Sequence, residues 1–133
     1  MLRVKRAYDP PEPSDGQRFL VERLWPRGVK KEALAADGWL KDVAPSTELR
    51  KWFAHQDERW EEFRRRYRTE LRANRAAWEP ILEAAKRGPV TLLYSAHDTE
   101  HNSALVLREY LIERGEGRRR RPTPKRGARR AKG

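Results

Sequence analysis

The chain has 133 residues, which corresponds to one domain, and its 37% hydrophobic residues, with five Trp, can bury a small core; this excludes a wholly disordered chain. It contains no Cys, which excludes disulfides, thiol catalysis, thiolate zinc sites and iron–sulfur clusters, and it shows neither a bilayer-spanning apolar run nor a secretory signal, so we expect a soluble, cytoplasmic protein without a membrane partner. The net charge of +11 suggests a polyanionic partner until its distribution is considered.

Three segments have the pattern of β-strands. Residues 2–7 alternate apolar and charged side chains, which is typical of a half-buried strand, and a loop rich in Pro, Asp and Gly follows at 9–16. Residues 18–24 (RFLVERL) predict a second strand. Residues 90–95 (VTLLYS) are almost wholly apolar, which indicates a central parallel strand that is covered on both faces.

The segments between and after these strands have helical periodicity. We predict a short helix over 30–36, a helix after Ser46, a helix over 57–72, a helix that ends at Gly88 and is disturbed by Pro80, and a last helix over about 98–114. Ser46 is placed to cap its helix. Arginines 64–66 and 68 are interspersed with Glu at helix-neighbour spacings, so we interpret them as a solvated ion-pair surface.

The end of the chain carries most of the charge. Residues 118–133 hold nine Lys or Arg and no acid, which leaves residues 1–117 nearly balanced, with 22 basic against 20 acidic side chains. The segment has no large apolar residue, so we predict an α/β domain over 1–115 and a disordered basic tail over 116–133. Such a tail attracts polyanions, including nucleic acid, without reading sequence, or it serves only as a solubilising extension.

The element order predicts the α/β fold class, with a small, mainly parallel sheet flanked by helices and a helical segment inserted between the second and third strands. In this architecture ligands bind beyond the carboxyl ends of the strands. Residues 23–28 (RLWPRG) follow the second strand, and residues 95–102 (SAHDTEHN) follow the third. If these two strands are neighbours, both segments meet at one edge of the sheet.

The same motifs carry a family resemblance. Residues 23–28, 39–53 (WLKDVAPSTELRKWF) and 92–102 (LLYSAHDTEHN) resemble those of the YeaO-like proteins, domain-of-unknown-function family 488, and the similarity covers about residues 3–113. The resemblance implies a small bacterial cytoplasmic α/β protein of unestablished activity. Members often have Lys where this chain has His97, so a cation at that position depends here on protonation of the imidazole.

The segment after the second strand offers groups that bind anions. Arg23 and Arg27 present planar sets of donors that suit a phosphate or carboxylate, although ion pairs within the fold are an equal alternative. Gly28 permits close backbone approach or, as we favour, a left-handed turn. Trp25 can line a pocket or pack locally.

The segment after the third strand holds His97, Asp98 and His101, our candidates for proton transfer. His-x-x-x-His places two imidazoles on one helix face only if His97 is helical, and Asp98 as N-cap leaves His97 outside. The familiar helical zinc signature has Glu beside the first His, so we predict no metal site here. With Asp98 as cap, the backbone N–H groups of residues 99–101 form an anion site at the helix start.

Further candidates surround these two segments. Tyr94 and Ser95 point to opposite faces, so one of them reaches the strand ends and the other belongs to the core, and Asn102 lies close by. Arg50 and His55 can reach the same edge from a helix laid over it. Ser46 is a helix cap rather than a nucleophile, because no strained G-x-S-x-G turn frames it.

Two classes of function follow from the sequence. The first is binding of, or action on, a small anionic ligand (phosphorylated, carboxylated or nucleotide-like) at the strand carboxyl ends. The second is a nucleic-acid-associated or regulatory module that uses the basic tail, and a protein-interaction domain is a third alternative. No Gly-rich phosphate loop, dinucleotide fingerprint or hydrolase motif is present, so the sequence identifies no cofactor, reaction or oligomeric state.

Overall fold

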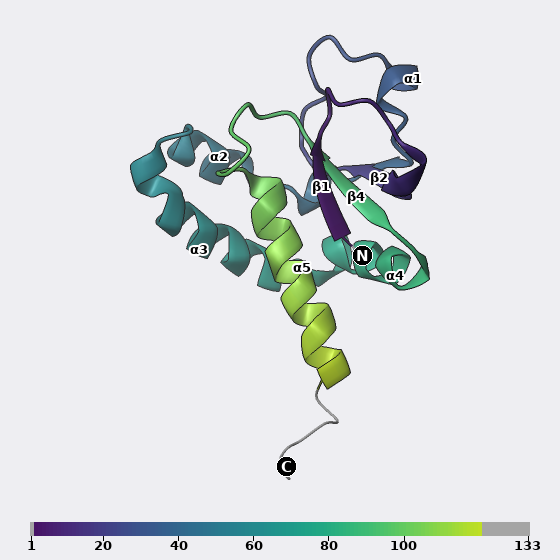
Figure 1. Ribbon diagram of the computed structural model, residues 1–133. Coiled ribbons are helices and arrows are strands. Elements are labelled where there is room, and N and C mark those ends of the chain that lie inside the picture. The colour runs from purple at the N-terminus through teal and green to yellow at the C-terminus, as the bar shows by residue number, and fades with distance from the viewer. Residues whose placement is uncertain (1, 121–133) are drawn as a thin grey trace.

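The computed structural model describes residues 2–120, with side chains described through residue 115. Four parallel strands form one sheet in the order β1-β4-β2-β3 (Figure 1). Their bounds are Leu2–Arg6 (β1), Gln17–Leu20 (β2), Gly38–Trp39 (β3) and Val90–Tyr94 (β4). The α/β class and the parallel sheet are therefore as the sequence predicts.

Strand β4 lies at the centre of the sheet. All five of its residues are buried, and it pairs with β1 along its whole length and with β2 over residues 90–93. This confirms that the second and third strands predicted from the sequence are neighbours. Two details differ from the prediction. Strand β2 ends at Leu20, so residues 21–24 are not part of it, and β3 was not predicted because its two residues are too few to show a pattern.

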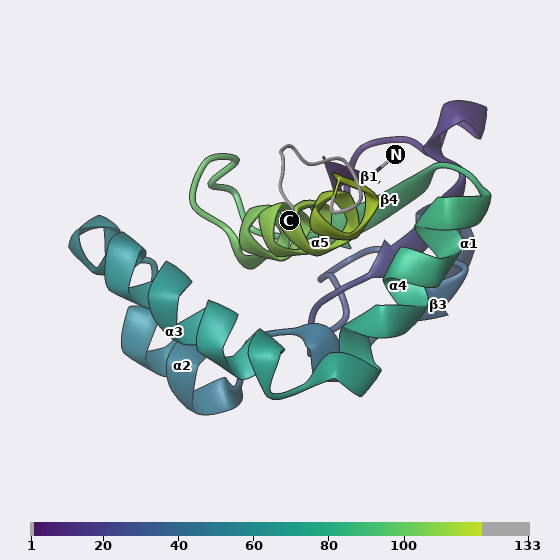
Figure 2. The ribbon, with the colours of Figure 1, turned by 90° about the horizontal axis from the view of Figure 1, so that it is seen from below.

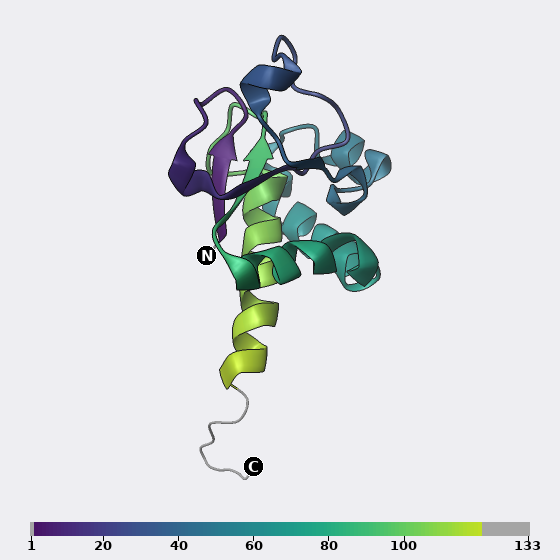
Figure 3. The ribbon, with the colours of Figure 1, turned by 90° about the vertical axis from the view of Figure 1, so that its right-hand side faces the viewer.

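Helices cover both faces of the sheet unequally. The helices are α1 (Lys31–Leu34), α2 (Thr47–Phe53), α3 (Trp60–Arg72), α4 (Arg75–Arg87) and α5 (Ser103–Arg120), with short 3-10 turns at Pro13–Asp15, Lys41–Val43 and Asp57–Arg59. Figure 2 shows α2, α3 and α5 on the side of the sheet away from α1. The main core lies between the sheet and α2 to α5, and a small cluster of Ala7, Leu20, Leu34 and Leu93 packs at α1. Figure 3 shows α5 running behind β4. The two cores contact opposite faces because alternate residues of β4 point in opposite directions.

The predicted helix starts are close for α1 and α2, whereas α3 begins at Trp60 after a 3-10 turn and α5 begins later than predicted. The Ser46 hydroxyl accepts a hydrogen bond from the Leu49 N–H at 3.1 Å, which confirms the predicted cap, and α4 continues through Pro80. The last helix, predicted from about residue 98, begins at Ser103, and its Asn102 side chain accepts from the Leu105 N–H at 3.1 Å. The prediction of Asp98 as the helix cap is therefore wrong, because Asn102 takes that position.

The far end of α5 extends beyond its predicted end near residue 114. The helix continues to Arg120, and the rest of the predicted tail lies outside the described residues. Among residues 2–120, no helix combines the length and the apolar composition that crossing a bilayer needs.

A buried ion pair lies at the amino end of strand β2. Asp15 and Arg18 are 1% and 4% exposed, and their carboxylate and guanidinium lie 2.5 Å apart. Arg18 also donates to the Leu34 carbonyl at 2.7 Å, while Lys5 contacts Asp15 at 3.0 Å. Because every charge in this group has a partner, its burial is tolerated.

This ion pair predicts an acid-sensitive fold. Burial alone would raise the pKa of the Asp15 carboxyl, but hydrogen bonds from the Glu12 N–H, Lys5 and Arg18 together lower that pKa below its ordinary value. The stabilisation is therefore complete above about pH 4, where an unfolded Asp is ionised, and is lost as the pH falls through the lower folded pKa. We expect the urea midpoint to fall between pH 6 and pH 3, and to fall less steeply in Asp15→Asn. Equal slopes in the two proteins would contradict this role.

Two helix ends predict a stabilising substitution. Ala35 and Ala54 follow α1 and α2 with φ of 51° and 46°, in the left-handed region where a Cβ is unfavourable. Ala54→Gly should raise the free energy of unfolding by about 1 kcal/mol, measured by urea denaturation. The matched control is Ala76→Gly, an exposed helical position in α4 where Gly should lower it instead.

Candidate functional site

A cavity of about 290 Å³ lies at the carboxyl ends of β2 and β4. It is lined by the segment after β2 (Glu22, Arg23, Leu24), by α2 with its flanking residues (Ala44, Pro45, Arg50, Lys51, Phe53, His55), by Phe63 of α3, and by the segment before and at the start of α5 (Ser95, Ala96, His101, Asn102, Ser103). The two segments singled out in the sequence thus meet, together with α2, around one space.

Glu22 and Ser95 join the two strand-end segments. The Ser95 hydroxyl donates to one Glu22 carboxylate oxygen at 2.6 Å, and the Ser95 N–H donates to the other at 3.1 Å. Tyr94, one residue earlier, is buried in the core, and burial raises the pKa of its hydroxyl. Of the alternating pair, Ser95 is therefore the residue that reaches the cavity.

Arg23 is held against the start of α2. Its Nε donates to the Pro45 carbonyl at 2.9 Å and one terminal nitrogen contacts the Ala44 carbonyl at 3.5 Å. This satisfies one edge of the guanidinium and fixes its direction. The sequence also allowed an ion pair between Arg23 and an acidic residue of the fold. Among residues 2–115 Arg23 forms none, and its acceptors are backbone carbonyls.

The last turn of α2 brings further cations to the cavity. Arg50 and Lys51 line it, and among residues 2–115 neither side chain has a hydrogen-bond or ion-pair partner. His55 follows Ala54 and both have positive φ, 57° and 46°, so the chain turns sharply and carries the imidazole to 5.7 Å from the Phe53 ring. Strained backbone of this kind is frequent at functional sites.

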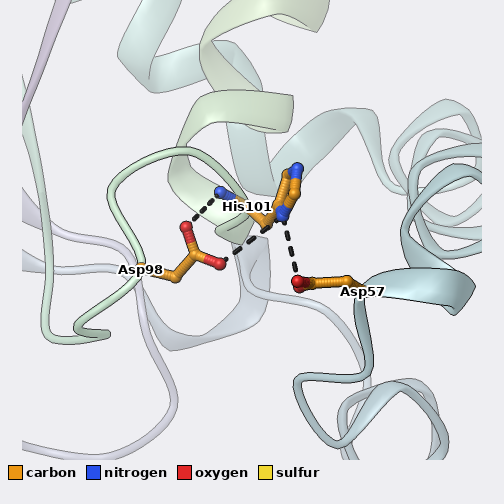
Figure 4. A group of neighbouring side chains, drawn as sticks. All are labelled: Asp57, Asp98 and His101. Atoms are coloured by element: carbon orange, nitrogen blue, oxygen red, sulfur yellow. Dashed lines mark hydrogen bonds and ion pairs between the residues drawn. The ribbon is translucent and has the colours of Figure 1, made fainter.

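His101 connects α5 to the segment before α3. Its Nδ1 lies 3.3 Å from a carboxylate oxygen of Asp57 and 3.5 Å from one of Asp98 (Figure 4). The centre of its ring lies 4.8 Å from that of Trp60. An imidazole with Nδ1 held by carboxylates keeps Nε2 for another contact.

Asp98 closes a turn before α5. One of its carboxylate oxygens accepts from the Glu100 and His101 N–H groups, both at 2.9 Å, and these two hydrogen bonds hold the pKa of the carboxyl below its ordinary value. Asp98 therefore takes two of the three N–H groups at which the sequence predicts an anion site, those of Glu100 and His101. His97 is exposed, does not line the cavity and precedes the helix, so His97 and His101 do not share a helix face.

A different group has the spacing of metal ligands. Oxygen and nitrogen atoms of Asp57, Asp98 and His101 lie within 4.8 Å of one another, which is close enough to share an ion. The contacts among them and the turn N–H groups account for this geometry without a metal.

Several predicted candidates lie away from the cavity. Trp25 donates to the Val29 carbonyl at 2.6 Å and packs edge-on against Trp39, which is local packing. Gly28 has φ 77° and no atom within 4 Å of where a Cβ would stand, so it serves turn geometry. Arg27 is exposed and outside the lining. Ser46 bonds Glu70 at 2.7 Å as well as capping α2.

Other residues of the site escaped the sequence analysis. Glu22 and Lys51 carry charge into the cavity, Phe53 and Phe63 form its wall, and Asp57 contacts His101. Glu22 lies inside the strand that the sequence predicts over 18–24, so its actual position at the strand-end edge, just after β2, gave no signal. Asn102 does line the cavity, but its side chain is engaged with the Asp98 carbonyl and the Leu105 N–H.

Comparison with known proteins supplies the family. A family model described as "Inactive DUF488-N3 subclade" matches residues 1–126. The chain belongs to this DUF488 family. It is 49% identical over 110 residues to the "Uncharacterized protein YeaO" of Escherichia coli (strain K12), covering 83% of this chain and 96% of that protein. It is 42% identical over 110 residues to the "Uncharacterized protein Rv3073c" of Mycobacterium tuberculosis (strain ATCC 25618 / H37Rv), covering 83% and 92%. No solved structure matches the chain.

The family assignment confirms the resemblance that the three motifs predict, and the curated DUF488 relatives named above are uncharacterised. Two of those motifs meet at the cavity. The first residues of motif 23–28 and the last residues of motif 92–102 line it. The third motif, 39–53, supplies the cations of α2.

The Glu22–Ser95 contact predicts a measurable effect on stability. Ser95→Ala removes the hydroxyl donor and should lower the free energy of unfolding by about 1–2 kcal/mol, measured by urea denaturation. Glu22→Gln should cost less, because the amide oxygen still accepts from the Ser95 N–H. A larger loss in Glu22→Gln than in Ser95→Ala would show that charge, rather than hydrogen bonding, joins the two segments.

Proposed function

We propose that this protein is a binding domain for a small anionic ligand, phosphorylated or carboxylated, held in the cavity at the strand carboxyl ends. The observation that carries the proposal is the set of charges around the cavity. Arg23, Arg50 and Lys51 line it against a single carboxylate, Glu22, whose two oxygens already accept hydrogen bonds from Ser95.

The contrast with α3 supports this reading of the cations. On α3, Arg64 pairs with Glu109 at 2.7 Å, Arg68 pairs with Glu113 at 2.5 Å, and Arg66 pairs with Glu62 at 2.7 Å. This bears out the ion-pair surface that the sequence predicts. Arg50 and Lys51 lack such partners among residues 2–115, so their charges are available to a ligand at low cost of rearrangement.

The chemistry of the cations suits an oxyanion. Arg23 is oriented by two backbone carbonyls, and a guanidinium held in this way presents its remaining N–H groups in a fixed direction. Lys51 adds a point charge and Arg50 a second planar donor set. A phosphate or carboxylate with paired oxygens matches these donors.

We assign no reaction to the site. The matched family is described as inactive, and this description supports binding over catalysis. His101 keeps one ring nitrogen for a ligand contact, while Asp98 is used by a turn and His97 lies outside the lining. A cytoplasmic location fits a domain that binds a soluble metabolite.

The test uses the full chain and thermal or calorimetric titration with inorganic phosphate, acetate, phosphosugars and nucleotides. We expect at least one of these anions to raise the melting temperature, because a ligand that binds only the folded state stabilises it. Arg50→Gln should weaken that binding about ten-fold, the effect of removing one charge-assisted contact.

Arg27→Gln is the matched control, since it removes the same charge from the same sheet edge but outside the cavity. It should leave binding unchanged. Equal losses in Arg27→Gln and Arg50→Gln would mean that net charge alone attracts the anion. The same pair of variants tests the tail alternative: nucleic-acid binding that ignores both substitutions and disappears with added salt would point to residues 118–133.

A further inference from the structure

The cavity has an apolar wall in addition to its cations. Leu24 lines it and is 65% exposed, the largest exposure among the large hydrophobic side chains of residues 2–115. The buried rings of Phe53 and Phe63 stack with their centres 4.5 Å apart and form the floor, with Pro45 beside them. A site for a bare inorganic anion has no use for such a wall.

We infer that the ligand of this cavity carries its anionic group on a flat, unsaturated ring. This inference rests on the proposed function, which concerns only the anionic group of the ligand, and it adds the ring to which that group is attached. Leu24 covers one face of the ring and the Phe53–Phe63 floor meets its edge, while Arg50 and Lys51 bind the anionic group.

The composition of the wall favours a ring over a flexible chain. Flat groups pack edge-on or offset against aromatic side chains with centres 4.5–7 Å apart, and this contact adds to the burial of apolar area. The wall also includes a polar aromatic group, His55, whose ring nitrogens have no partner among residues 2–115. A heteroatom of the ring can hydrogen-bond there.

The volume sets the size of the ligand. A cavity of about 290 Å³ lies at the small end of ligand pockets, which hold about 300–1,000 Å³. It therefore takes one ring system and one anionic group rather than a dinucleotide. Aryl carboxylates and nucleoside monophosphates share this chemistry, and the experiment separates them.

The experiment is calorimetric titration of the full chain with matched probes. Benzoate is compared with acetate, and adenosine monophosphate with ribose 5-phosphate, so that each pair differs in the ring. We expect the ring-bearing member of one pair to bind at least about ten-fold more tightly, which corresponds to the burial of one ring face. The pair that shows the preference identifies the source as carboxylate or phosphate.

Two variants test the apolar and the cationic residues of the lining separately. Leu24→Ser changes an exposed side chain, so the fold should be retained, and it should lower the affinity of the ring-bearing probe several-fold without changing that of its ringless partner. Arg50→Gln should weaken both. Tyr8→Ser, an exposed aromatic position outside the lining, is the control and should change neither.

The outcomes distinguish this inference from the proposed function. If acetate or ribose 5-phosphate binds as tightly as its ring-bearing partner and Arg50→Gln still weakens both, the ring inference is wrong and the anion site stands. If neutral benzamide or adenosine binds as tightly as benzoate or adenosine monophosphate, the cations are not used and both are wrong. Absence of binding by every probe up to about 10 mM overturns both as well.

Discussion

The burial of β4 on both faces is the constraint on which the rest of the structure depends. Because β4 pairs with β1 on one side and β2 on the other, the chain must leave β2, build a whole helical layer and return to the centre of the sheet. That return places the end of β4 beside the end of β2. The contact between Glu22 and Ser95 follows from this adjacency, and both residues line the cavity.

Much of this arrangement is readable from local sequence, since the strongest signals come from burial. The apolar run at 90–95 predicts a central strand that is covered on both faces. If this strand pairs in parallel with the second one, the two motifs that follow the strands lie side by side. Residues 18–24 mislead because Val21 and Leu24 continue an apolar pattern after the strand has ended. Val21 enters the core, while Leu24 is left at the cavity mouth. Pattern alone does not separate these two uses of an apolar side chain.

The start of α5 shows a different limit. Asp98 and Asn102 are both good capping residues, and each does accept backbone N–H hydrogen bonds, one in a turn and the other in the helix. Local sequence favours either. In the observed structure the helix begins after His101, and His101 packs on Trp60 and contacts Asp57 from that position. These two contacts join residues more than forty positions apart, so Asp57 and Trp60 could not be assigned to His101 from sequence.

Charge acquires meaning only through its partners, and the arginines of this chain demonstrate this. Arg18 is buried against Asp15, Arg23 is fixed by carbonyls, and Arg50 has no partner among residues 2–115. Four arginines of α3 are paired with Glu, namely Arg64, Arg65, Arg66 and Arg68. Net charge treats all of them alike. In Arg18, in Arg23 and in the paired arginines of α3, residues of the fold already accept hydrogen bonds from part or all of the guanidinium donors. Arg50 and Lys51, which have no partner among residues 2–115 and line the same cavity as Arg23 and Leu24, keep their donors available to a ligand. A ligand that presents both an anion and a flat apolar surface contacts these cations and Leu24 together. The binding of a polyanion that is attracted by overall charge would not depend on this geometry.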